Sequence, residues 1–237
     1  MITFDEQKKK YDNYGLIWPF LPMTHLHQET LQKAIKDVLE GAKTKKRGFL
    51  ETVDIQLKLK GYNISKDKRF VGSIKLPHII RPNVRIGVLG NKVHCEEAQK
   101  LNIPAYDLPT LTNFNKEKKV VKAWTKRHHL FLASPDVIGQ VNKVLGQVYT
   151  RANKFPTNIK TDTVAKVVDE VKRTANIRLK KSVAFGIPIG NVNMTERQVF
   201  ENLTLCTNYV VTLLKKGWQS IGSIVLKSTM GKAHRIY

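Results

Sequence analysis

Hydrophobic and polar residues follow two different patterns along the chain, and the first begins after residue 23. Apolar residues recur there at helical spacing and predict an amphipathic helix; they are Leu31, Ile35, Val38, Leu39 and Ala42. Residues 51–60 then alternate strictly between polar and apolar, which predicts a half-buried strand of an antiparallel sheet. A second strand at 70–76 follows a polar loop, and we expect it to pair with the first.

The second pattern fills the middle of the chain. Residues 84–89 and 130–133 are short and almost continuously apolar, as expected of strands buried on both faces. A helix is predicted between them at 94–101. Another starts after Ser134, which suits an N-cap, with Pro135 at the first helical position. Strands that alternate with helices indicate a parallel α/β architecture.

Beyond residue 156 the first pattern returns. It predicts a helix over 164–171, a strand over 177–186, a helix opened by the capping box Thr195–Gln198, and a last strand over 221–229. The predicted fold is therefore an α+β split domain, an antiparallel sheet with helices, that carries an inserted α/β Rossmann-like three-layer domain.

The same patterns predict the domain boundaries. Residues 23–80 and 157–237 would form the α+β domain, and residues 81–156 the inserted domain. Residues 1–22 contain aromatic residues without periodicity and are predicted to be an arm of unknown role. Proline or glycine interrupts both connections, which suits a hinge.

Charge narrows the class of partner. The chain has 41 Lys and Arg against 19 Asp and Glu, a formal net charge of +22 that is spread over its whole length. A basic body of this kind indicates a polyanion: RNA, DNA or an anionic membrane. The membrane is the weakest of these, because no run approaches the roughly 18 apolar residues of a span. The two cysteines lie far apart, which argues for a reducing compartment and against a disulfide scaffold.

Catalytic motifs find little support in the sequence. Gly87 and Gly90 follow a strand, but the remainder of a dinucleotide fingerprint is missing. His128 and His129 precede a buried strand and fit a strand entry better than a ligand pair. We predict no catalytic residue, no metal site and no cofactor. A nucleotide-dependent enzyme remains the alternative from a different functional class.

Two segments are candidates for contact with a nucleic acid. The exit from the last strand offers hydroxyls, an apolar side chain and a glycine that permits close approach; the residues concerned are Ser223, Lys227, Ser228, Thr229, Met230, Gly231 and Lys232. Cations also crowd the end of the first helix, just before Phe49; they are Lys45, Lys46 and Arg47. An ordinary turn and a favourable helix dipole would explain part of this pattern, but a helix end needs only one or two cations. Because the exposed side of 51–60 lacks aromatic residues, we expect a folded RNA to be read by shape.

Several stretches resemble the ribosomal protein L-one family, in particular its eukaryotic cytosolic form, L-ten-a. They are F-L-E-T-V-D-I-Q from Phe49, K-D-K-R-F-V-G-S-I-K-L-P-H from Lys66, F-P-T from Phe155, G-I-P-I-G from Gly186 and K-S-T-M-G-K from Lys227. The resemblance runs from about residue 23 to the end. It implies the split fold, and it implies RNA contacts at Phe49, Ser223, Thr229, Met230 and Gly231. The family's basic residue before the phenylalanine is displaced here, since Gly48 stands in its place and Arg47 one step back.

The resemblance also implies a function. It suggests a structural, non-enzymatic constituent of the large ribosomal subunit that binds large-subunit rRNA at the mobile stalk near the tRNA exit site. The expected partners are that rRNA, the deacylated tRNA in the exit site, whose release it would assist, and the large subunit itself. The expected location is the cytoplasmic ribosome, after passage through the nucleolus during assembly. A nucleolar ribosome-assembly factor of the same fold is the alternative within the fold.

Overall fold

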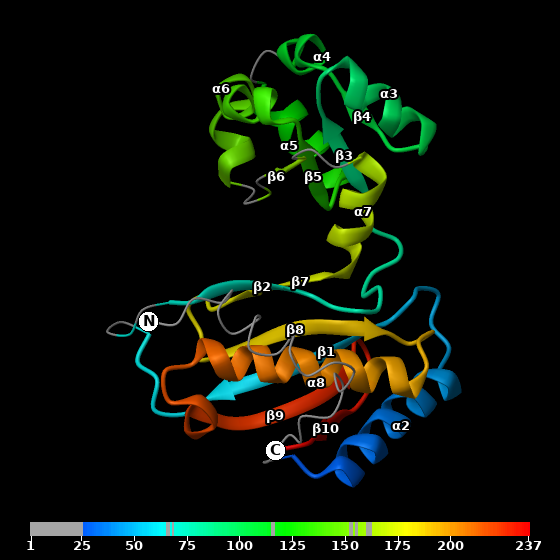
Figure 1. Cartoon of the computed structure of the whole chain (residues 1–237), viewed down its shortest axis with the longest axis vertical. Helices are drawn as coiled ribbons and strands as arrows, with labels where there is room; N and C mark the ends of the chain where they lie inside the picture. The colour runs from blue at the N-terminus through cyan, green and yellow to red at the C-terminus, as the bar shows by residue number, and fades with distance from the viewer. Residues whose placement is uncertain are drawn as a thin grey trace, which may run out of the picture. The chain divides into compact units, whose positions relative to one another are not determined.

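A computed structural model describes residues 26–64, 67, 69–114, 117–151, 154, 156–159 and 163–237. The predicted arm, residues 1–22, lies outside them. Contacts divide the chain into two compact units: Arg178–Tyr237 with the residues up to Gly72, and Ser73–Ile177. The first contains an antiparallel sheet with helices and the second a parallel sheet with interleaved helices, so the predicted fold class is confirmed (Figure 1).

The first unit is built on a four-stranded sheet in the order β10-β9-β1-β8. Its strands are β1 (Thr52–Leu59), β8 (Ala184–Asn191), β9 (Ile221–Ser228) and β10 (Ala233–Arg235). Strand β1 is antiparallel to both of its neighbours. Its alternation is confirmed, because Val53, Ile55, Leu57 and Leu59 are all buried. This apolar face is covered by α2 (Gln28–Thr44) and α8 (Glu196–Leu213), which cross the sheet on one side in Figure 1.

Three predictions about strands were wrong. The strand at 70–76 is β2 (Val71–Lys75), and it pairs with β7 (Thr174–Arg178) in a separate sheet and not with β1. Both edges of β1 are taken by β8 and β9, which come from the far end of the chain. The predicted strand 177–186 is divided between β7 and β8, because the lysine-containing segment between them turns the chain. Strand β9 is not the last one, since β10 pairs with it.

The second unit contains a parallel sheet in the order β4-β3-β5-β6. Its strands are β3 (Ile86–Leu89), β4 (Ala105–Tyr106), β5 (Leu130–Ala133) and β6 (Thr157–Asn158). Two apolar cores lie on opposite faces of this sheet. One is formed with α4 (Leu108–Thr112), α5 (Lys118–Arg127) and α6 (Pro135–Arg151, interrupted at Gly146). The other is formed with α3 (Lys92–Lys100) and α7 (Val164–Arg173).

Helix α7 belongs to the second compact unit, Ser73–Ile177. Its stripe of Val164, Val167 and Val168 packs in the same core as Ile86 and Val88 of β3. The apolar stripe predicted that the helix packs against an apolar surface, but it could not show which one. The sequence analysis placed this helix with the antiparallel sheet, whereas it packs against the parallel sheet. The predicted domain boundaries stay a prediction: one domain of residues 23–80 and 157–237, and an inserted domain of residues 81–156.

Candidate nucleic-acid interface

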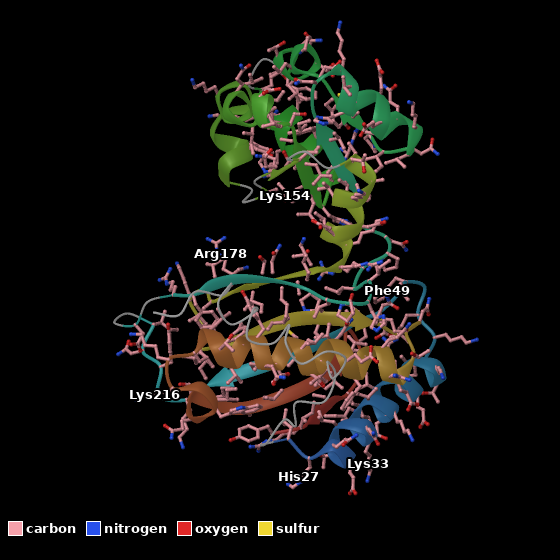
Figure 2. The ribbon with its side chains drawn as sticks, in the orientation of Figure 1. His27, Lys33, Phe49, Lys154, Arg178 and Lys216 are labelled. Atoms are coloured by element: carbon pink, nitrogen blue, oxygen red, sulfur yellow. The ribbon has the colours of Figure 1, made fainter. Side chains whose placement is uncertain are left out.

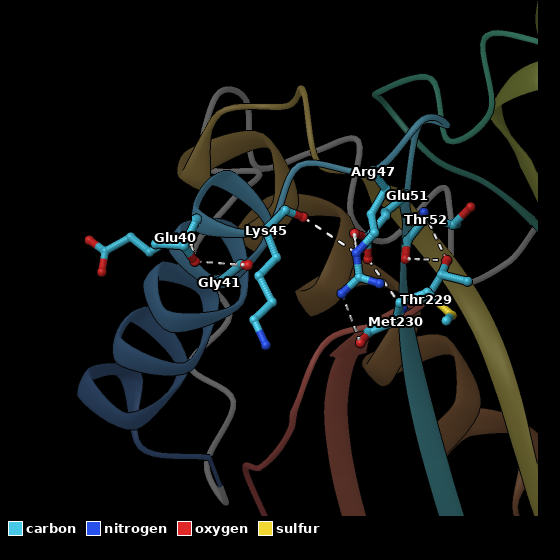
Figure 3. Close-up of polar contacts among 9 residues, drawn as sticks. Glu40, Gly41, Lys45, Arg47, Glu51, Thr52, Thr229 and Met230 are labelled. Atoms are coloured by element: carbon cyan, nitrogen blue, oxygen red, sulfur yellow. Dashed lines mark hydrogen bonds and ion pairs between the residues drawn. The ribbon is translucent and has the colours of Figure 1, made fainter.

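Two segments far apart in the sequence meet at one end of the first unit's sheet. Strands β1 and β9 are antiparallel, with Val53 opposite Ser228. The chain entering β1 and the chain leaving β9 therefore run side by side (Figure 3). We call the residues 45–52 and 228–232 the β1–β9 interface.

Thr229 joins these two segments. Its backbone N–H donates to the carbonyl oxygen of Thr52 at 3.0 Å. Its hydroxyl accepts from the Thr52 N–H at 3.1 Å and donates to the Thr52 carbonyl at 3.2 Å. A hydroxyl has one donor and two lone pairs, so only one lone pair of Thr229 remains for another partner. Its first role is to hold the turn to the strand.

Glu51 and Arg47 hold the turn after β9 through its backbone at Met230. Glu51 is only 4% exposed, and its Oε2 accepts from the Met230 N–H at 3.1 Å. Its Oε1 lies 3.6 Å from Arg47 Nε, and Arg47 Nη2 donates to the Met230 carbonyl at 3.4 Å. Arg47 Nε also donates to the carbonyl of Lys45 at 3.4 Å. A buried carboxylate needs such partners, since an unpaired one would be strongly destabilising.

Sequence reasoning missed Glu51, although a signal was present. Glu51 is in phase with Val53 and Ile55, which occupy the buried side of the alternating strand. A charged residue in that phase has to be buried with a partner. The partner Arg47 was predicted as an RNA contact, and in the structure it is turned toward Glu51 and Met230 (Figure 3).

The outer surface of the β1–β9 interface combines apolar and cationic groups. Phe49, labelled in Figure 2, is 52% exposed, and Met230 is 59% exposed, which is unusual for side chains so large and apolar. Lys45, Lys46 and Lys232 are exposed around them. Apolar side chains among amines can contact riboses or bases while the amines neutralise phosphates.

Ser228 and Gly231 form the inside of the turn. Ser228 is 1% exposed, and its Oγ has no hydrogen-bond partner among the described residues. A Cβ added to Gly231 would lie 2.3 Å from that oxygen. Ser228 is therefore a buried residue beneath Gly231 and not a surface hydroxyl. The alternation of β9 decides this, because Ser228 is in phase with buried Leu226.

Ser223 and Lys227 lie on the sheet face that the helices leave uncovered. Lys227 pairs with Asp54 beside the turn, and Ser223 pairs with Lys58 near the other end of the strand. Ser223 thus stands apart from the remaining predicted contacts. The open face between the two residues carries exposed polar groups such as Gln56.

The glycines that suggested a nucleotide site are filled by the protein itself. A Cβ on Gly87 would meet Phe131 at 3.1 Å, and one on Gly90 would meet the Ser134 hydroxyl at 2.9 Å. Both glycines are packed against neighbouring side chains. Among the residues that the structure describes, no group of three His, Cys, Asp or Glu side chains is arranged to hold a metal ion. Nor does that part of the chain contain a helix of the length and apolarity that crossing a bilayer requires.

Comparison with known proteins decides the family. The profile of the ribosomal protein L1p/L10e family matches residues 28–232, which include both segments of the β1–β9 interface. The chain belongs to this family. It is 43% identical to the large ribosomal subunit protein uL1z of Arabidopsis thaliana, 42% to uL1 of Oryza sativa subsp. japonica and 41% to uL1B of Schizosaccharomyces pombe. Each alignment spans 216 residues, which are 91% of this chain and all of the relative. The predicted membership of the L1p/L10e family is thus confirmed.

Proposed function

We propose that this protein is a structural, non-enzymatic component of the large ribosomal subunit that binds large-subunit rRNA through the β1–β9 interface. One observation carries the proposal. Two segments more than 170 residues apart, both within the family match, are brought together with Phe49 and Met230 exposed among lysines. A catalytic pocket would instead bring acids, bases or nucleophiles together.

The geometry suits recognition of a folded RNA by shape. The turn is fixed through Thr229, Glu51 and Arg47, so its surface is preorganised and little entropy is lost on binding. Lys45, Lys46 and Lys232 supply positive charge for phosphates. Such a surface can follow the wide, shallow minor groove of an RNA helix or a junction between helices.

The resemblance to the family extends the proposal to a place on the ribosome. We infer that the rRNA is that of the mobile stalk near the tRNA exit site, and that the protein assists release of the deacylated tRNA from that site. The protein would work on cytoplasmic ribosomes after joining them in the nucleolus. On this account it positions RNA and converts no substrate.

Sedimentation of the tagged full chain through a sucrose gradient tests the proposal. We expect the wild type to accompany mature large subunits and polysomes. Met230→Asp places a charge on the apolar part of the interface and should move the protein to the light fractions. Val93→Asp is the matched control, because Val93 is an apolar residue of α3 that is 65% exposed and lies outside the interface. Wild type found only with pre-ribosomes would favour the assembly factor. Equal sedimentation of the two variants would show that the β1–β9 interface does not bind rRNA.

A further inference from the structure

The second unit has its own excess of positive charge. Residues 73–177 contain 18 Lys and Arg against 8 Asp and Glu. None of the predicted RNA contacts lies in this unit. Binding at the β1–β9 interface therefore does not account for the positive charge of the second unit.

Helix α5 concentrates this charge on its outer face. Its buried side consists of Val121, Trp124 and Thr125. The exposed side carries five cations and no acid: Lys118, Lys119, Lys122, Lys126 and Arg127. No ion pair joins any of these five to another described residue. The arrangement costs stability, because like charges four residues apart repel and lysines in the first turn oppose the helix dipole.

Arg85 and His129 bring two side-chain N–H donors close together at the end of α5. They precede β3 and β5, which pair with Ile86 opposite Leu130. The backbone N–H of Arg85 donates to His129 Nδ1 at 3.1 Å, so Nδ1 carries the lone pair and Nε2 the proton of the neutral ring. Nη2 of the Arg85 guanidinium lies 3.4 Å from that Nε2. Two donors cannot bond to each other, whereas an anionic oxygen can accept from both.

Lys154 adds a further cation to this cluster. Its amine donates to the Thr125 and His128 carbonyls at 2.8 and 2.6 Å and so caps the end of α5. Burial, followed by the charges of Arg85, Lys154 and Arg81, lowers the pKa of His129. Burial and Arg85 likewise lower the pKa of Lys154. Among the described residues, every charge that acts on these two groups is positive, so the cluster favours an anion as its partner.

We propose that the outer face of α5 and the adjoining cluster of Arg81, Arg85 and His129 form a second RNA-binding surface that takes backbone phosphates. Lys118, Lys122 and Lys126 lie about 6 Å apart along the helix axis, so they present regularly spaced charge to a phosphate chain. Among the described residues that we assign to this surface there is no Phe, Tyr or Trp to stack on bases, so it would bind without reading sequence. The choice of RNA as the polyanion rests on the proposed function. The prediction that the surface binds phosphates rests only on its cations and donors.

The salt dependence of binding by the full chain tests this surface. The probe is deproteinised large-subunit rRNA, and the variant combines Arg85→Gln, Lys122→Gln and Lys126→Gln. The control combines Lys92→Gln, Lys100→Gln and Lys143→Gln, which removes the same charge from exposed positions of the same unit. We expect the slope of log Kobs against log salt to be shallower by about 2 for the variant and nearly unchanged for the control. Equal slopes for the two would overturn the proposal.

The titration of His129 and the choice of polyanion give two further measurements. RNA phosphate beside Arg85 should move the titration of the His129 ring upward, because it offsets the cations that face the ring; an unmoved titration contradicts the proposal.

Binding by the wild type to an unrelated RNA duplex tests the proposed function instead. Absence of any preference for rRNA would count against that function while leaving the slope difference intact. Loss of binding to phosphatidylserine vesicles, with RNA binding unchanged in the variant, would assign the surface to a membrane.

Discussion

Single residues beneath the exit turn of β9 determine its shape. Gly231 has no side chain because the Ser228 hydroxyl fills the place where a Cβ would lie, 2.3 Å away. The Ser228 hydroxyl itself is buried without a partner among the described residues, which is an unfavourable position for a polar group. The two residues are therefore coupled, and their substitutions should not be additive.

A double-mutant cycle measures this coupling. We expect Gly231→Ala alone to lower the free energy of unfolding by about 1–3 kcal/mol through overpacking. Ser228→Ala alone should be nearly neutral or stabilising, because it removes an unpaired buried hydroxyl. In the double variant the nearest contact becomes Ser228 Cβ at 3.4 Å, so most of the loss should be recovered. Urea unfolding checks this, and additive effects would show that the clash is relieved elsewhere.

Thr229 should act through the fold before it acts on RNA. Thr229→Val leaves the Thr52 N–H without the acceptor that it has now, and we expect a loss of about 1–2 kcal/mol in the free energy of unfolding. Thr229→Ser keeps both hydroxyl bonds and should behave nearly as wild type. Chemical denaturation of the protein without RNA distinguishes the two. A Val variant of full stability that binds rRNA poorly would instead assign the hydroxyl to RNA.

His128 should make the second unit sensitive to acid. It is 5% exposed, its Nε2 lies 3.0 Å from the Tyr106 hydroxyl, and its Nδ1 has no partner in the described chain. Burial, followed by nearby cations, holds the pKa of His128 below its ordinary 6.5. The unfolded chain thus binds more protons below pH 6.5, and stability falls as the pH drops from there toward the folded pKa.

We expect His128→Gln to flatten this dependence. Urea unfolding between neutral pH and about pH 5 would be followed by the fluorescence of Trp124, which neighbours His128, with the other two tryptophans replaced by Phe. The wild type should lose stability on acidification more steeply than the variant. Identical curves would mean that His128 does not titrate differently in the folded unit.

Among the elements, α8 is positioned by its first turn and by a buried amide. The Thr195 hydroxyl accepts from the Gln198 N–H, and the Gln198 side chain accepts from the Thr195 N–H, which completes the predicted capping box. Asn202, fully buried, donates to the carbonyl of Ile189 in β8 at 2.8 Å. The cap starts the helix, and the amide holds it to the sheet.

Loss of the cap should have a modest and specific effect. We expect Thr195→Ala to reduce the free energy of unfolding of the first unit by about 1 kcal/mol. Thr195→Ser retains the oxygen that accepts the hydrogen bond and should restore most of it. Thermal or urea denaturation of the three proteins gives the comparison, and an equal loss for Ala and Ser would exclude the hydrogen bond as the cause.

At the scale of the whole molecule, the chain passes between its two units at β2 and β7. The unit boundaries fall within these paired strands, and the Leu76 N–H donates to the Arg173 carbonyl at 3.0 Å. These two residues are thus close enough to be joined. Replacing 77–172 by a short Gly-Ser linker removes the second unit and keeps both strands.

We expect this deletion to preserve the preference for rRNA, since the β1–β9 interface lies outside the deleted segment. Its salt slope should be shallower than that of the full chain, because the α5 surface is gone. Ribosomes that carry the deletion should release tRNA more slowly. Loss of rRNA preference in the binding assay would show that the interface depends on the second unit, and normal tRNA release would exclude that part of the proposed function.

The sequence alone determined the fold class of each of the two units, α+β and α/β, and most of their helices. Helical and alternating spacing is a property of neighbouring residues, so α2, β1, β5 and the capping box of α8 were predictable from local pattern. The same holds for the two interface segments, whose composition and family resemblance are visible in the residues themselves. What alternation could not provide was the partner of each strand, and hence β1 was paired with β2.

Only the tertiary structure decided how the interface is made. Thr52 and Thr229 are 177 residues apart, and their contact depends on the register of β1 against β9. That register buries Ser228, turns Arg47 toward Glu51 and leaves Phe49 and Met230 exposed. The tertiary structure also shows which helices and strands share a core, as α7 does with β3. Pairing and burial are set by the free energy of the whole packed chain, so no local stretch of sequence contains them.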